Sequence, residues 1–163
     1  MGRSFFSKSG IIKLWVNQTN GPETSQQVAD WYSITHMLHG IALYFLIWLV
    51  ARRKWRLGFC MLLAIAAEAA WEIFENCPYT INRFRAATAA DGYYGDSILN
   101  SFFDSIFSLA GFFLARYLPA WATILFIVIT EVGLALAVRD NLTLNIIMLI
   151  HPFESIKHWQ MGG

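Results

Sequence analysis

Residues 31–75 read WYSITHMLHGIALYFLIWLVARRKWRLGFCMLLAIAAEAAWEIFE, and this stretch decides the fold class. It contains two apolar runs, Ile34 to Val50 and Leu57 to Phe74, separated by a basic cluster from Arg52 to Arg56. Each run approaches the roughly 20 residues that an α-helix needs to cross a membrane. Because lipid offers no hydrogen-bond partner to the backbone, both runs must be helical. The stretch therefore predicts a membrane-embedded helical hairpin.

Two further apolar runs follow in the second half of the chain. Ile98 to Leu118 is interrupted by a few polar residues, and Pro119 to Val138 only by Glu131. Charged residues make up 14% of the 163 residues, whereas a soluble domain carries about 25%. A transmembrane barrel is excluded because the runs are continuous rather than alternating. We therefore predict an all-α fold, a polytopic transmembrane helical bundle of about four spans with a short interfacial C-terminal helix.

We expect the whole chain, residues 1–163, to form one membrane domain. Leu142 to Ile150 is too short to span, and Pro152 then breaks it, which indicates an interfacial or re-entrant piece. An external N-terminus with no preceding span is unusual, so either a short tail crosses unaided or a further helix precedes it. The expected segments are an external N-terminal segment (1–30), spans at about 32–50, 57–75, 97–117 and 119–138, and an interfacial C-terminal segment (141–163).

The basic residues predict the orientation of the chain. The Arg52 to Arg56 cluster belongs on the cytoplasmic side, since short cytoplasmic loops are rich in Lys and Arg. The loop from Asn76 to Gly95 and both termini then lie outside. Arg83 and Arg85 also fall outside, against this rule. We expect at least one of the two to pair with a nearby carboxylate.

Ionisable side chains recur at one depth in the predicted spans. Counting 1.5 Å per residue, one such group on each span lies about 10 to 12 Å below the outer end of its helix. The spacings i, i+3, i+4 and i+7 place the polar residues of a span on a single stripe. Polar stripes avoid lipid, so we expect them to form a funnel open to the outside. The deepest layer of this funnel comprises His39, Glu68, Asp104 and Glu131. The layer above it comprises His36, Glu72 and Asn100, and the outer rim comprises Glu75, Asn76 and Asp96.

Such a group of carboxylates cannot be buried fully ionised without compensation. A divalent metal ion is one solution, and His and carboxylate side chains on facing helices are suitable ligands. A second solution is that the carboxylates pair with Arg83 or Arg85, and a third is that some of them retain their protons. The structural alternative is a salt-bridged network that only fixes helix packing. The candidate metal ligands are His36, His39, Glu68 and Asp104.

Short motifs occur along nearly the whole chain: Ser25-Gln26-Gln27, Asp30-Trp31-Tyr32, Thr35-His36, His39-Gly40, Trp71-Glu72, Glu75-Asn76, Arg83-Phe84-Arg85, Tyr94-Gly95-Asp96-Ser97, Asn100-Ser101, Asp104, His151-Pro152, Glu154 and Trp159-Gln160. Together these motifs resemble an uncharacterised family of small bacterial multi-pass membrane proteins. The resemblance implies a bacterial inner (cytoplasmic) membrane protein, but it implies no activity. A fainter likeness to VanZ-like proteins runs through the His39 to Tyr44 stretch, the acidic second span and Asp96 to Asn100 after Arg85.

Two functional classes stay open at this stage. The first is a metal-dependent hydrolase, or a binder, of a lipid-linked or amphipathic substrate, with membrane lipid as its natural partner. The second is a non-catalytic accessory subunit that contacts other membrane-protein subunits. A net charge of +1 gives no reason to expect a nucleic-acid partner. Under the first reading the catalytic residues are Glu68, Glu72 and Asp104, and the substrate-binding residues are Arg83, Arg85, Asn76, Asp96 and Asn100.

Overall fold

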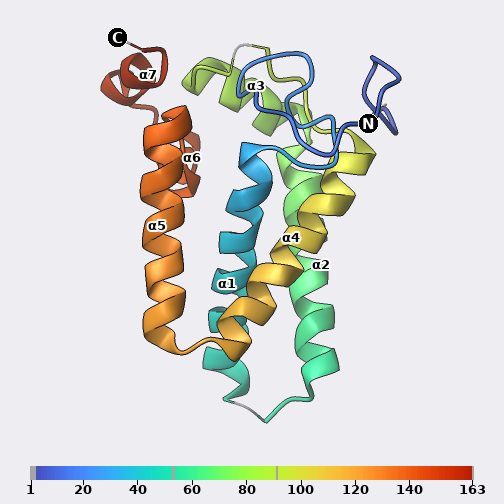
Figure 1. Cartoon of the computed structure of the whole chain (residues 1–163), viewed down its shortest axis with the longest axis vertical. Helices are drawn as coiled ribbons and strands as arrows, with labels where there is room; N and C mark the ends of the chain where they lie inside the picture. Colours follow the sequence, from blue (N-terminus) through green and yellow to red (C-terminus); the bar gives the residue numbers. More distant parts are fainter. Residues whose placement is uncertain (1–2, 53, 91, 163) are drawn as a thin grey trace.

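The structure is a computed structural model, which describes residues 3–52, 54–90 and 92–162. The fold over these residues is entirely helical, as predicted. Four helices are long and apolar enough to cross a membrane. Three shorter helices, α3, α6 and α7, gather at one end of this bundle (Figure 1). The elements in chain order are α1 (Trp31–Ala51), α2 (Leu57–Glu75), α3 (Pro78–Ala87), α4 (Ile98–Tyr117), α5 (Ala120–Val138), α6 (Leu142–Ile150) and α7 (Glu154–Gln160).

Local signals explain where the spans begin and end. The Asp30 carboxylate accepts hydrogen bonds from the backbone N–H groups of Tyr32 and Ser33, which starts α1 with a capping box. Ser97 caps α4 in the same way by accepting from the Asn100 N–H. Pro119 follows shortly after the end of α4. A proline disfavours the helical conformation of the residue before it, which here is Leu118, so the helix ends at Tyr117.

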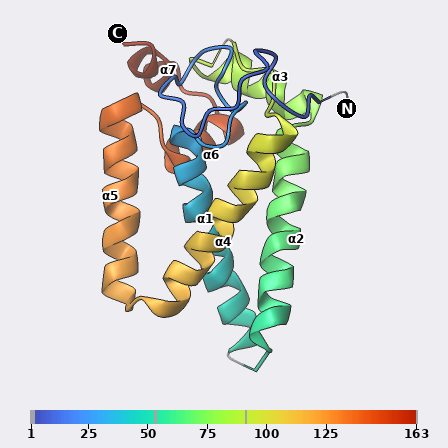
Figure 2. The same ribbon diagram turned by 45° about the vertical axis from the view of Figure 1, so that its right-hand side comes forward.

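The core of the bundle is a close crossing of α1 and α4, which are drawn passing diagonally over each other in Figures 1 and 2. Gly40 and Gly111 make this approach possible. A Cβ atom on Gly40 would lie 1.7 Å from the Ser108 carbonyl oxygen, and one on Gly111 would lie 1.9 Å from that of Met37. Small residues let membrane helices pack backbone to backbone in this manner.

The outer surfaces of the long helices are apolar. Leu62 on α2 is 61% exposed, Ile129 on α5 is 61% exposed, and Leu136 on α5 is 80% exposed. An exposed apolar patch of this extent is unusual for a soluble monomer but normal for a surface that faces lipid. The pattern agrees with four membrane-spanning helices.

The two ends of the bundle carry different segments of the chain. The N-terminal segment, α3, α7 and the C-terminus share one end, while the α1–α2 connection and the α4–α5 turn lie at the other (Figures 1 and 2). This grouping is the one that the basic cluster predicted. The expectation of a plain loop over residues 76–95 was wrong, because Pro78–Ala87 forms α3. Pro78 at the first helical position favours this start, because its missing N–H would have no partner there.

Candidate functional site: a buried histidine and carboxylate cluster

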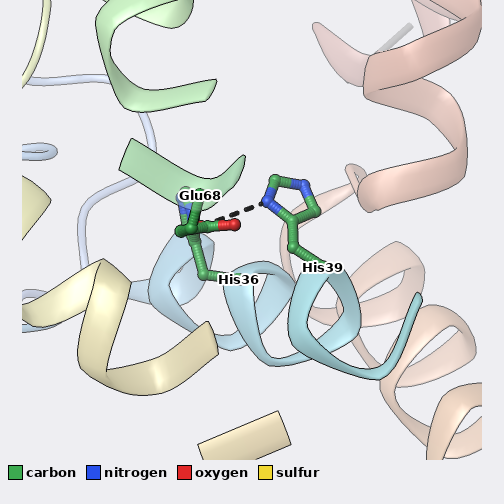
Figure 3. A group of neighbouring side chains, drawn as sticks. All are labelled: His36, His39 and Glu68. Carbon is green, nitrogen blue, oxygen red and sulfur yellow. Dashed lines mark hydrogen bonds and ion pairs between the residues drawn. The ribbon is translucent and has the colours of Figure 1, made fainter. Parts of the chain in front are cut away.

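The centre of the site joins α1 to α2 through two histidines and one glutamate. His36 Nδ1 lies 2.6 Å from Glu68 Oε1, and His39 Nδ1 lies 3.4 Å from the same oxygen. Figure 3 shows both rings turned toward the Glu68 carboxylate. His36 and Glu68 are buried, whereas the His39 side chain is 16% exposed. One ligand atom from each residue falls within 4.8 Å of the others, which suits a metal ion.

Two more carboxylates surround His36. Its Nδ1 atom lies 3.6 Å from Glu72 Oε1, and its Nε2 atom lies 3.9 Å from Asp104 Oδ2. Among the described residues, both Glu72 oxygens and Asp104 Oδ1 are buried and make no hydrogen bond. Such groups are rare in native structures and normally have a bound ion, water or proton as partner. Within the described part of this cluster, every ion pair has a histidine as its basic partner.

The rim of the cluster is a separate hydrogen-bonded group. Asn76 Nδ2 donates to Asp96 Oδ2 at 2.6 Å, and the Asp96 N–H donates to Asn76 Oδ1 at 2.6 Å. The Tyr93 hydroxyl donates to Asp96 Oδ1 at 3.0 Å. Burial, with the Asp96 carboxylate beside it, raises the pKa of Tyr93 well above its ordinary value. The phenol therefore keeps its proton and stays a donor. Glu75, also at the rim, groups with His36 and Glu72 as a second set of potential ligands.

Other predicted site residues have different neighbours. Asn100 donates from Nδ2 to the Gln27 carbonyl oxygen at 3.1 Å, so it ties α4 to the N-terminal segment. Arg83 donates to the carbonyl oxygens of Leu149 and Ile150 at the end of α6. These carbonyls are available because the last carbonyls of a helix lack intrahelical donors. The expected pairing with a carboxylate, which required only one of Arg83 and Arg85, stays a prediction. Arg85 is exposed near the end of α3.

Glu131 does not join the cluster, contrary to the predicted polar layer of four helices. Its carboxylate accepts from the backbone N–H groups of Leu142 and Thr143, both at 3.1 Å. The chain after α5 therefore turns back along that helix before α6 begins. Leu142 packs against the core residues Leu38 and Ile41. The first turn of α6 thus lies at the level of the middle of α1, beside the site.

Sequence reasoning missed a second polar node, at Asp140. Its carboxylate accepts from the Asn141 N–H, the Tyr32 hydroxyl, Asn145 Nδ2 and Gln160 Nε2. Burial raises the pKa of Asp140 to about 6. This one carboxylate connects α1, α6 and α7. The Asp140-Asn141 pair ahead of an apolar run is a helix-start signal that predicts a cap, but not its partners.

The cluster opens into a cavity that, with its mouth, encloses about 850 Å³ of space not occupied by protein atoms. His36 and His39 on α1 and Asp104 on α4 line it together with residues of α6. No Lys or Arg lines it within the described ranges. Its lining comprises Thr19, Asn20, Gly21, Thr24, Ser25, Tyr32, Thr35, His36, His39, Trp71, Glu75, Phe84, Thr88, Ala90, Tyr93, Asp96, Asp104, Asp140, Leu142, Asn145, Ile146 and Leu149.

Comparison with known proteins places the chain among bacterial relatives. A UPF0314 protein of Agrobacterium fabrum is 44% identical over 98% of this chain and 80% of its own length. One from Rhizobium johnstonii is 46% identical over 99% of this chain and 83% of its own length. One from Sphingopyxis alaskensis is 42% identical over 100% of this chain and 86% of its own length. No solved structure matches the chain significantly.

These comparisons agree with the resemblance to a family of small bacterial membrane proteins, and the fainter likeness to VanZ-like proteins is not among them. A family profile described as "Protein of unknown function (DUF2585)" matches residues 1–162. The chain therefore belongs to the DUF2585 family, the UPF0314 proteins.

Proposed function

We propose that this protein is a bacterial inner-membrane protein that binds a divalent metal ion at His36, His39 and Glu68. The ion then serves to hydrolyse a bond in an amphipathic substrate held in the cavity. The helical spans support a location in the inner membrane, because outer-membrane proteins are typically barrels. The basic connection between the first two spans fits the cytoplasmic side of that membrane. The cluster faces the end of the bundle assigned to the outside.

The observation that carries the proposal is the convergence of His36, His39 and Glu68, which bring one ligand atom each within 4.8 Å of one another. The carboxylates around His36 add to the need for a cation or protons at this place. Glu72 is 5% exposed and Asp104 is 3% exposed, yet three of their four oxygens make no hydrogen bond in the described structure. Burying an uncompensated carboxylate is strongly unfavourable, so the site requires a cation or protons. Two imidazoles and a carboxylate within 4.8 Å of one another supply the ligand types that divalent transition metals take.

The residues around the proposed ion have complementary tasks. Three protein ligands leave a coordination position for water, which is the arrangement of catalytic rather than structural zinc sites. A bound divalent ion lowers the pKa of that water and makes it a nucleophile near neutral pH. Glu72, whose Oε1 lies 3.6 Å from His36 Nδ1, is placed to accept the proton that the water loses.

A purely structural role is the second candidate. It is favoured by the 2.6 Å contact between His36 Nδ1 and Glu68 Oε1, which is a good hydrogen bond without any ion. In this case the cluster would fix α1 against α2, and the protein would serve as an accessory subunit of a larger membrane complex. This candidate leaves both Glu72 oxygens and Asp104 Oδ1 without a hydrogen bond and places no charge beside them other than that of His36, whereas a divalent ion at the cluster would offset part of their charge.

The decisive experiment is elemental analysis of the detergent-purified protein after extensive dialysis against metal-free buffer. We expect close to one divalent ion per chain, and its loss in Glu68→Gln. A metal-free wild-type protein that cannot be loaded with Zn²⁺, Mn²⁺ or Co²⁺ would reject the metal site. Hydrolysis is tested separately by incubating the loaded protein with a bacterial lipid extract. Mass spectrometry should detect released head groups or acyl chains, and Glu72→Gln should abolish their release.

A further inference from the structure

The cavity is covered on the side of the N-terminal segment. Asn20 Nδ2 donates to the Ala89 carbonyl oxygen, and the Tyr94 hydroxyl donates to that of Pro22. Gln26 Nε2 donates to the Gly95 carbonyl oxygen at 2.7 Å. These bonds join the segment before α1 to the segment before α4, and residues of both segments line the cavity. The funnel that the sequence predicted to be open at this end therefore has a hydrogen-bonded roof.

The sides of the cavity are framed by three helices. Trp71 on α2, Phe84 on α3 and Ile146 on α6 all line the cavity. Arg83 holds α3 to the end of α6, and Lys157 Nζ donates to the Ala86 carbonyl oxygen at 2.8 Å. The helix α3 thus connects the upper ends of α2 and α6. In Figure 3, the His39 ring faces the Glu68 carboxylate, to which a dashed line joins it.

The two walls differ sharply in chemistry. The α1 and α2 wall carries His36, His39 and Glu75, whereas the α6 wall contributes Leu142, Ile146 and Leu149. Ile146 lines the cavity and is 45% exposed, so the apolar wall is open at this residue. Under the proposed topology, this opening lies beside the membrane. A cavity with one polar and one apolar wall, continuous with lipid, fits an amphipathic molecule lying with its tail along α6.

The charge of the cavity restricts the head group. Glu75, Asp96, Asp104 and Asp140 line it, Glu68 and Glu72 lie directly behind, and neither Lys nor Arg faces it in the described ranges. One divalent ion neutralises at most two of these carboxylates. An anionic phosphate would be desolvated with no Lys or Arg to pair with it, beside acids that are either ionised or must stay protonated, and both cases are unfavourable. Arg83, expected from the sequence to hold an anionic head group, is instead engaged by α6.

We infer that the cavity takes its ligand sideways from the membrane between α2 and α6, and that this ligand is an amphipathic lipid with an uncharged or cationic head group. The inference rests on the proposed function in that the head group would lie beside the proposed metal site. It names the substrate class and its route, which the metal site alone does not.

The test uses the full-length protein in zwitterionic phosphatidylcholine nanodiscs with two photoactivatable probes. Both carry the same diazirine-bearing acyl chain, but one is a monoacylglycerol and the other a lysophosphatidic acid. After irradiation, peptide mass spectrometry compares adducts on residues 142–150 with adducts around Leu136, which faces lipid on α5. We expect the neutral probe to label α6 at its cavity face and the anionic probe to label it about tenfold less, a difference of about 1.4 kcal/mol.

A pair of variants tests the route. Ile146→Trp should narrow the opening and reduce the cavity adducts about tenfold, again about 1.4 kcal/mol. Ile129→Trp is the matched control, because Ile129 is 61% exposed on α5 and does not line the cavity. Equal labelling by the two probes would overturn the head-group assignment. Cavity labelling unaffected by Ile146→Trp, or absent while Leu136 is labelled, would overturn lateral entry.

The outcomes for the metal and for the lipid are separable. Glu68→Gln should lose the ion and keep the lipid adducts, because Glu68 does not line the cavity wall that holds the tail. Adducts in a protein that binds no metal would leave the lipid route standing and reject the proposed hydrolase. If Ile146→Trp fails to fold, which gel filtration would reveal, Leu149→Phe on the same wall replaces it.

Discussion

The Glu131 carboxylate on α5 accepts a hydrogen bond from the backbone N–H of Leu142, the first residue of α6, at 3.1 Å. Glu131 lies seven residues before the end of its own helix. The contact therefore means that the chain returns about 10 Å along α5 before α6 starts. A carboxylate at a helix N-terminus satisfies free N–H groups and interacts well with the helix dipole. It fixes the wall of the cavity that faces His39.

Removing this cap should loosen α6. We expect Glu131→Ala to lower the free energy of unfolding by about 1 to 2 kcal/mol, because two N–H groups lose their acceptor. Glu131→Gln keeps one acceptor oxygen and should lose less. Hydrogen–deuterium exchange of residues 142–150 in detergent measures the local effect. Unchanged exchange in both variants would contradict the role assigned to Glu131.

The α1–α4 crossing makes a strong steric prediction. Gly40→Ala and Gly111→Ala each place a methyl group inside contact distance of a backbone carbonyl. We expect each to destabilise the protein by about 3 kcal/mol, the upper range for overpacking. Gly133→Ala is the control, since nothing lies within 4 Å of its added Cβ atom. Thermal unfolding in detergent should rank the two core variants well below Gly133→Ala.

Asp140 should make stability depend on pH. Burial raises its pKa from 3.8 to about 6. Because the folded-state pKa is the higher one, folding favours the protonated acid. This contribution to stability is full below about pH 4, is lost as the pH rises to about 6, and stays lost above that. The contribution of Asp140 to the free energy of unfolding changes by at most about 3 kcal/mol across this range.

The measurement compares thermal unfolding of the wild type and Asp140→Asn between about pH 4 and pH 8. The variant cannot ionise at this position, so it should gain stability relative to the wild type as the pH rises through this window. Glu154→Gln, at an exposed position on α7, is the control and should show a constant offset. A constant offset for Asp140→Asn as well would refute the prediction.

The proposed metal site predicts that replacing His39 weakens metal affinity, whereas replacing His158 does not. His39→Ala removes one of three ligands and should weaken metal affinity by more than the roughly 10- to 100-fold that loss of an outer-shell partner costs. His158→Ala removes an exposed imidazole on α7 and should leave affinity unchanged. Competition with a fluorescent chelator measures both. Equal affinities would exclude His39 as a ligand.

The orientation predicts opposite accessibility at the two ends of the bundle. In a background with Cys60 and Cys77 replaced by serine, Gly92→Cys should react with a membrane-impermeant maleimide in intact bacterial spheroplasts. Lys54→Cys lies in the basic connection and should react only after the membrane is permeabilised. The reverse pattern would invert the topology and turn the cluster toward the cytoplasm.

The sequence alone determined the four spans and the convergence of His36, His39, Glu68, Glu72 and Asp104. Both follow from local periodicity: long apolar runs must be helical in lipid, and polar residues three or four positions apart share a face that lipid excludes. The chemical roles of these residues stay predictions. The start of α6 was also locally encoded, in the Asp140-Asn141 pair, although its position was not.

Only the tertiary structure decided what Glu131 and Arg83 bind and how the cavity is closed. Glu131 matched the depth of the other acids, but depth along a helix does not say which side of the bundle a residue faces. The roof depends on pairs such as Gln26 and Gly95, which are 69 positions apart. No periodic pattern encodes a contact of that range, because it depends on how whole helices pack. The shape of the cavity is therefore a property of packing, whereas the polar groups that line it were already present in the sequence.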